Sequence, residues 1–216
     1  LYIHNILKQF PVYKTLANDR KYYVIFNISK SSMLLWISYS IFLGYNRNLL
    51  SFTSIDWSNQ ILYKNITALY SITDIAPLFI NRKKMMKSTV IHHVCVFLAY
   101  LKIVSSDLVT TTIPNAIILY GLFSSLAFVV NFYLGFRFIT KNESLKTLFK
   151  KLAFISYILA CTYNWSIQST YLYSYISNVY TKYSENPLNI GYLGLYMSFL
   201  YFWISDDIIL MKYLSK

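Results

Sequence analysis

The chain has 216 residues, of which 56% are hydrophobic and only 13% are charged, and its formal net charge is +12. A soluble globular domain has about a quarter of its residues charged, so the composition argues against a soluble domain and for one membrane-embedded unit. The positive charge does not indicate a nucleic-acid-binding protein, because the cations lie in short clusters between apolar blocks and form no continuous basic face.

Apolar blocks of the length that crosses a bilayer recur along the chain, and such a crossing needs about 20 mostly apolar residues. We predict six transmembrane helices, at Tyr22–Gly44, Ile61–Ile80, Ser88–Ser105, Ile113–Phe136, Leu148–Tyr171 and Leu188–Ser205. Asp206–Leu214 either continues the last helix or forms an interfacial tail. The sequence therefore predicts an all-α polytopic protein with one domain over 22–216 and a cytoplasmic segment over 1–21, which we expect to be truncated because it begins at Leu1.

Positive charge between the helices predicts their orientation, because Lys and Arg mark the cytoplasmic side of membrane proteins. These residues cluster before the first helix, between the second and third, between the fourth and fifth, and after the sixth, whereas the other three connections contain few of them. We therefore expect both termini on the cytoplasmic side. Lys30, near the start of the first helix, is expected to extend toward that surface.

Asp74, His92 and His93 form the clearest candidate site, because ionisable groups inside apolar segments are costly and usually functional. At 1.5 Å per residue they lie roughly 6–9 Å below the cytoplasmic surface, on helices joined by a short loop. An Asp–His contact there would orient an imidazole for general-base or nucleophilic chemistry, or would simply be a structural hydrogen bond. No metal site is predicted, because neighbouring side chains on a helix point about 100° apart and His4 is the only other histidine.

Further polar residues lie on single faces of the later helices. Asn131 shares a face with Ser124, and Asp207 shares one with Tyr196 and Trp203. In the fifth predicted helix a polar stripe is formed by Tyr157, Cys161, Asn164, Gln168 and Tyr171. Such residues either line a cavity for a ligand or form hydrogen bonds between helices. We expect Ser124, Asn131, Tyr157, Asn164, Gln168 and Asp207 to line a cavity, with solvated charges at the cytoplasmic edge as the alternative for Asp206 and Asp207.

With Tyr70 and Asp74 four residues apart in the second helix and the run Met86–His93 at the start of the third, the chain resembles the TLC (TRAM/Lag/CLN) domain family. The resemblance extends to Ser124, Ser125 and Asn131 and covers the chain from about Tyr22 onward. It implies a six-helix bundle with a lipid cavity open to the cytoplasmic leaflet, lined in part by Tyr70, in the endoplasmic reticulum or a related membrane of a eukaryotic host. The segment Ile117–Phe123 lacks the acids and histidine of the Lag motif, so the resemblance points to the branch without that motif.

Two functions follow from this interpretation. The first is a lipid acyltransferase with acyl-CoA as co-substrate, in which His92 or His93 is the base or the acyl-carrying nucleophile and Asp74 orients it. The alternative is a non-catalytic protein of lipid binding, lipid homeostasis or trafficking. A channel or transporter is less favoured, because no inverted repeat is visible. Membrane lipids are the expected partners, no bound cofactor is expected, and the sequence does not indicate an oligomeric state.

Overall fold

Long apolar segments with few helix-breaking residues give a structure made of helices, with no strand within the described residues. This computed structural model describes residues 2–40, 57–81, 85–182 and 187–216. The two short N-terminal helices are α1 (Tyr2–Leu7) and α2 (Pro11–Thr15). The longer helices are α3 (Asn18–Tyr39), α4 (Gln60–Asn81), α5 (Lys87–Val104), α6 (Thr112–Ser124), α7 (Phe128–Phe136), α8 (Glu143–Lys182) and α9 (Pro187–Ser215).

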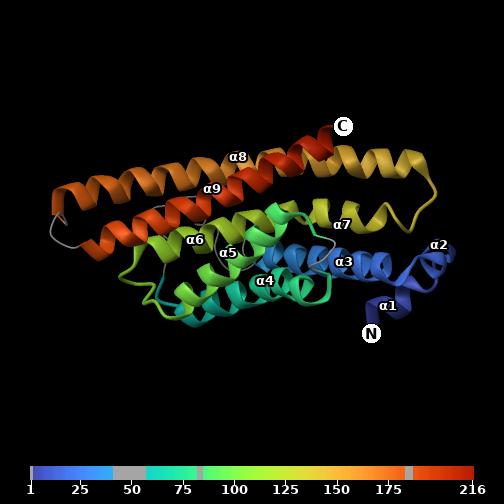
Figure 1. The fold of residues 1–216 in the computed structure, drawn as a ribbon, viewed down its shortest axis with the longest axis horizontal. Helices are drawn as coiled ribbons and strands as arrows, with labels where there is room; N and C mark the ends of the chain where they lie inside the picture. The colour runs from blue at the N-terminus through green and yellow to red at the C-terminus, as the bar shows by residue number, and fades with distance from the viewer. Residues whose placement is uncertain (1, 41–56, 82–84, 183–186) are drawn as a thin grey trace.

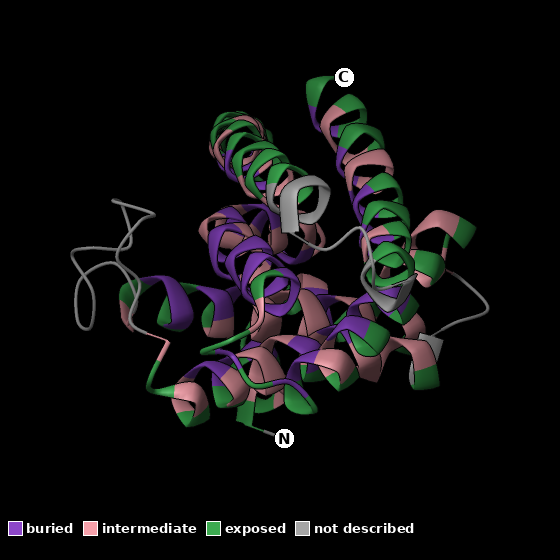
Figure 2. Cartoon of the chain, turned by 90° about the vertical axis from the view of Figure 1, so that its left-hand side faces the viewer, coloured by how far each residue is buried: buried purple, intermediate pink, exposed green. Residues whose placement is uncertain are grey.

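The longer helices lie along one axis, and α6 is at their centre (Figure 1). Neighbouring helices pack in a ring in which α3 contacts α4, α4 contacts α5, α5 contacts α9, and α9 contacts α8. Helix α7 closes the ring between α8 and α3, and α6 packs against members on several sides. Ten of the 13 residues of α6 are buried, as expected for a helix that is apolar on all sides. Figure 2 shows this concentration of buried residues at the centre and of exposed residues outside.

Three of the described helical segments are long and apolar enough to cross a membrane: Lys87–Val104, Thr112–Phe136 and Ile190–Ser215. They correspond to the third, fourth and sixth predicted helices. Only 22% of the first segment is buried inside the protein. Its outer face exposes large apolar side chains, namely Ile91, Val94, Phe97, Leu98, Leu101 and Val104. A continuous apolar surface of this kind is typical of contact with a membrane or a partner.

The predicted helix Ile113–Phe136 is not one regular helix. A 3-10 turn at Ser125–Ala127 separates α6 from α7. Ser125 explains the break, because its hydroxyl donates to the Leu122 carbonyl at 2.5 Å and exchanges a 2.9 Å hydrogen bond with Ser38 of α3. Serine side chains that bond to the local backbone compete with regular helix formation.

Other predicted boundaries also shift. Helix α8 extends well beyond the predicted Leu148–Tyr171, because polar residues at both of its ends are left out by a criterion of continuous apolar sequence. Helix α9 continues through Asp206–Leu214, so the first alternative for that segment is confirmed. The first predicted helix begins earlier, at Asn18, and the end expected at Gly44 lies outside the described residues.

The connection between α5 and α6 is fixed by Asp107. Its carboxylate accepts hydrogen bonds from the Val109 amide at 3.1 Å, the Thr110 hydroxyl at 3.1 Å and the Gln60 side chain at 2.6 Å. The hydrogen bond from the Val109 amide is the main reason why the pKa of Asp107 lies below its ordinary value. Since Gln60 begins α4, these bonds hold the start of that helix next to the α5–α6 connection.

Gly135 provides a test of the packing between α7 and α3. A β-carbon at this position would lie 2.9 Å from Ile28 Cγ1 and 3.3 Å from the Val24 carbonyl oxygen. We expect Gly135→Ala to lower the free energy of unfolding by about 1–3 kcal/mol, the usual cost of overpacking. Thermal unfolding in detergent measures the change. Gly194→Ala is the control, because its β-carbon meets nothing within 4 Å, and equal stability of the two variants would contradict the close approach.

Candidate functional site

A buried ion pair joins α3 to α4. The Lys30 ammonium contacts Asp74 Oδ1, and the Asp74 side chain is fully buried, with 0% exposure. On the other side His93 Nδ1 lies 3.3 Å from the same oxygen. The expected Asp–His contact between adjacent helices is therefore present, with His93 as the histidine. Lys30 was expected to extend toward the surface, but it points inward because Asp74 offers the opposite charge in the apolar interior.

His92 has different surroundings from His93. Its Nδ1 atom lies 3.3 Å from Asp206 Oδ2 of α9, and its side chain lines a cavity. The two imidazole rings are 5.5 Å apart between centroids and nearly perpendicular. Asp74, His92 and His93 nonetheless each place one donor atom within 4.8 Å of the other two. The structure thus brings the three predicted site residues together and adds Lys30 and Asp206.

The cavity has a volume of about 40 Å³. Along α5 it runs from His92 to Ile103, about 16 Å for eleven residues at 1.5 Å each. Most of its wall is apolar, and the polar members are Thr67, Tyr70, Ser71, Tyr100, Tyr120, His92 and Trp203. Tyr70 was expected at this position. A cavity needs about 10–15 Å³ to hold one water molecule, so this one accepts only a slender ligand segment.

A second buried carboxylate, Asp207, lies between α6, α8 and α9. It accepts hydrogen bonds from the Tyr120 and Tyr157 hydroxyls, both at 2.6 Å, and from the Trp165 indole at 3.3 Å. Asp207 is therefore not a solvated charge at the membrane edge, because its neighbours replace water as donors. Tyr120 also lines the cavity, so Asp207 orients one wall residue without reaching the cavity itself.

The polar stripe of α8 faces α6 and α9. Asn164 Nδ2 donates to the Tyr120 carbonyl at 3.1 Å and to Ser124 Oγ at 3.2 Å. Gln168 Nε2 donates to the Ala116 carbonyl at 3.1 Å, and Gln168 Oε1 accepts from the Tyr196 hydroxyl. These are bonds between helices, which was the structural alternative for this stripe.

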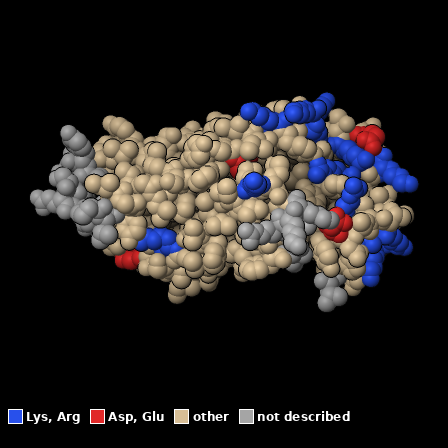
Figure 3. Space-filling view, in the orientation of Figure 1, with Lys and Arg blue, Asp and Glu red and all other residues tan. Residues whose placement is uncertain are grey.

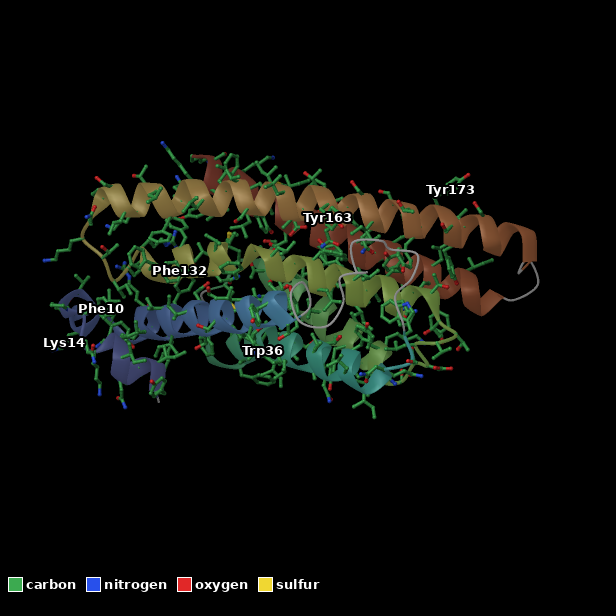
Figure 4. All side chains as sticks on the ribbon, turned by 180° about the vertical axis from the view of Figure 1, so that it is seen from behind. Phe10, Lys14, Trp36, Phe132, Tyr163 and Tyr173 are labelled. Carbon is green, nitrogen blue, oxygen red and sulfur yellow. The ribbon has the colours of Figure 1, made fainter. Side chains whose placement is uncertain are left out.

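Six residues that were expected to line a cavity do not line this one: Ser124, Asn131, Tyr157, Asn164, Gln168 and Asp207. The expectation is wrong for this cavity because it assumed that all polar faces converge, whereas the cavity opens between α4, α5 and α6. Asn131 is half-buried on α7. Figure 4 shows how side chains of one helix diverge: Tyr173 of α8 points out of the bundle, whereas Tyr163 points inward, with its ring 4.8 Å from that of Phe123.

Charge is distributed unevenly over the molecular surface. In Figure 3, Lys and Arg side chains gather at one end of the molecule, where α2 and the start of α8 lie. At that end Arg137 lies among the aromatic rings of Tyr23, Tyr133, Phe138 and Tyr213. Described Lys and Arg residues that are distant in the sequence therefore lie together at one end of the fold (Figure 3).

Neither a protein-family model, nor a curated protein, nor a solved structure matches the chain. The geometry of the cavity and of the side chains around it therefore carries the functional argument.

Substitution of Asp207 tests whether its hydrogen bonds stabilise the contact between α6, α8 and α9. Asp207→Asn replaces one acceptor oxygen by a donor, so one group that now donates to that oxygen loses its charged acceptor. A hydrogen bond to a charged group contributes about 1.5–3 kcal/mol, and we expect the free energy of unfolding to fall by at least about 1.5 kcal/mol. Thermal unfolding measures the loss. Asp206→Asn is the neighbouring control with a smaller expected loss, and an equal loss would argue against a special role for Asp207.

Proposed function

We propose that this protein binds a lipid acyl chain inside the bilayer, in the cavity between α4, α5 and α6. The observation that carries the proposal is the presence of two buried polar atoms in the mainly apolar cavity wall. Ser71 Oγ and Trp203 Nε1 are buried and have no hydrogen-bond partner among the described residues, and both residues line the otherwise mainly apolar cavity. Leaving buried polar atoms unpaired costs about 1–3 kcal/mol each, so a ligand that pairs with them gains binding free energy.

The unpaired atoms define the chemistry of that ligand. An indole N–H only donates hydrogen bonds, whereas a hydroxyl donates and accepts. The ligand therefore needs an oxygen acceptor attached to an apolar, slender chain, as in the carbonyl end of an acyl group. A few ordered water molecules would satisfy the same atoms, and the lipid content of the purified protein distinguishes the two occupants.

A crossing of the membrane by all six long helical units fits this function. Alongside the three apolar segments, α3, α4 and α8 run along the same axis (Figure 1). The gathering of Lys and Arg at one end supports the same orientation for all of them. In this proposal the bundle is of the TLC type, both termini are cytoplasmic, and the membrane is the endoplasmic reticulum or a related one in a eukaryotic host.

The contact between His92 and Asp206 favours acyl transfer as a second candidate. A carboxylate at Nδ1 leaves Nε2 of the same imidazole for a substrate, the arrangement of a general base. In this reaction His92 takes the proton of a lipid hydroxyl or amine as that group attacks the thioester carbonyl of acyl-CoA. The new ester or amide bond forms, the carbon–sulfur bond breaks, and the CoA thiol leaves with a proton. Asp74 and His93 would then hold α4 and α5 in place.

The six crossings predict which sites a membrane-impermeant maleimide reaches in sealed vesicles. The two native cysteines are buried, so single introduced cysteines report cleanly. Residues 5 and 144 should label from the cytoplasmic side, in the variants Asn5→Cys and Ser144→Cys. Exposed positions on the other side should label only from the opposite face, in the variants Asn59→Cys, Val109→Cys and Ser174→Cys. Labelling of all five from one side, or a glycan on Asn142, would overturn the topology.

Filling the cavity should remove the bound lipid. Gly121 lines the cavity, and a β-carbon there meets nothing within 4 Å, so Gly121→Leu fits without a backbone clash. We expect at least about a tenfold loss of tightly bound lipid, the equivalent of 1.4 kcal/mol, by mass spectrometry of the purified chain. Gly194→Leu is the matched control, because its β-carbon also meets open space but lies outside the cavity wall. Equal lipid in both variants would contradict the proposal.

Substitution of His92 tests the proposed acyl transfer. If the purified protein transfers acyl groups, His92→Gln should lower the rate at least about 100-fold, the lower end for general acid–base catalysis. His4→Gln is the control, because His4 is hydrogen-bonded to Tyr13 and does not line the cavity. Rates that match the wild type in His92→Gln, or no turnover by the wild type with any acyl-CoA, would remove this second candidate and leave lipid binding.

A further inference from the structure

Three side chains that the binding of an acyl chain does not require converge beside the cavity. Asp74 comes from α4, and His92 and His93 come from the first turns of α5. Their donor atoms, one for each residue, all lie within 4.8 Å of one another. Adjacent histidines on a helix were expected to point apart, but the tilt of their rings brings both toward the same carboxylate.

The atoms that face this space are not fully paired. Within the described residues, Asp74 Oδ2, His92 Nδ1 and His93 Nδ1 are buried and make no well-formed hydrogen bond, although each Nδ1 atom lies 3.3 Å from a carboxylate oxygen. Lys30 and His93 both approach the other Asp74 oxygen, Oδ1, so Oδ2 remains free. The side chains are nearly closed to solvent, with 0% exposure for Asp74 and 10% for His93. A buried carboxylate oxygen and two buried imidazole nitrogens without well-formed hydrogen bonds are three donor atoms that a bound ion would satisfy.

We propose that Asp74, His92 and His93 bind a divalent transition-metal ion, and that Asp206 supplies a fourth ligand. Imidazole nitrogen and carboxylate oxygen are donors that suit Zn²⁺ and Fe²⁺. Metal–ligand bonds of about 2.0–2.1 Å in a tetrahedral shell place the donor atoms about 3.3 Å apart. Side-chain rotations that move the donor atoms by about an ångström would bring them to these distances. Asp206 is already adjacent, with Oδ2 at 3.3 Å from His92 Nδ1.

The charges of the group are consistent with a divalent ion. The two carboxylates contribute two negative charges and Lys30 contributes one positive charge, so with neutral imidazoles the group lacks one positive charge. A divalent ion that also holds one anion, such as hydroxide, as a fifth ligand closes this balance, and buried charge without compensation is costly. Protonation of one histidine would close it as well, which is the competing explanation that the experiment has to separate.

Cobalt substitution separates a metal site from a protonated network. The full chain is purified in detergent without a histidine tag, stripped with a chelator and titrated with Co²⁺, whose visible absorption reports bound nitrogen and oxygen ligands. We expect one Co²⁺ for each wild-type chain, displaced by Zn²⁺. His93→Gln and Asp74→Asn should weaken binding at least about tenfold, since even supporting residues of metal sites cost that much. His4→Gln removes the remaining histidine and should bind as the wild type does.

Three further measurements keep the proposal testable if a ligand variant does not fold. Lys30→Met removes the ammonium but no ligand, so it should retain Co²⁺ binding. In the wild type alone, Zn²⁺ should raise the melting temperature and Mg²⁺ should not, because only a metal that binds the folded state stabilises it. Gly121→Leu should bind Co²⁺ normally, which separates this site from lipid binding. No Co²⁺ absorption in the wild type, or full binding in folded His93→Gln, would overturn the proposal and leave a protonated ion-pair network.

Discussion

A carboxylate inside an apolar bundle has to find partners, and this constraint fixes how most of the helices meet. An ion transferred from water to a low-dielectric interior carries a penalty of several kcal/mol unless charges or hydrogen bonds replace its hydration. Asp74 meets the requirement through Lys30 of α3 and His93 of α5. Asp207 meets it through hydroxyl and indole donors on α6 and α8. Together the two carboxylates join every long helix except α7.

The cavity lies between these two charged groups, and its wall includes residues that they hold. Tyr120 donates to Asp207 and His92 contacts Asp206, while both side chains line the cavity. Residues fixed by such outer partners cannot easily rotate away, which is how binding sites keep their polar groups oriented. Ser71 and Trp203 differ, because their polar atoms are buried in the wall and have no partner in the part of the chain that the structure describes.

The sequence predicted the helical class and a contact between Asp74 and one of the two adjacent histidines, because both depend on spacing along the chain. Hydropathy and a short connection were enough to place these residues at the same depth on neighbouring helices. The role of Lys30 could not be predicted in this way, because a lysine near a helix end satisfies the same rule whether it points outward or toward a carboxylate. The pairing of His92 with Asp206 depends on α9 packing against α5, which no local pattern specifies. The sequence indicated the polar stripe of α8, but it did not indicate that this stripe faces α6 and α9.

Helix α8 has 40 residues and is therefore about 60 Å long, twice the hydrocarbon thickness of about 30 Å. In Figure 1, α8 and α9 reach past the other helices as an antiparallel pair at the end away from the clustered lysines. The last described turns of α8 there expose Tyr173 and Ile176, and tyrosine prefers the headgroup layer. In the proposed orientation, exposed tyrosine on this pair lies in the headgroup layer and fixes the position of the bundle along the membrane normal. That position decides from which leaflet the cavity takes its ligand.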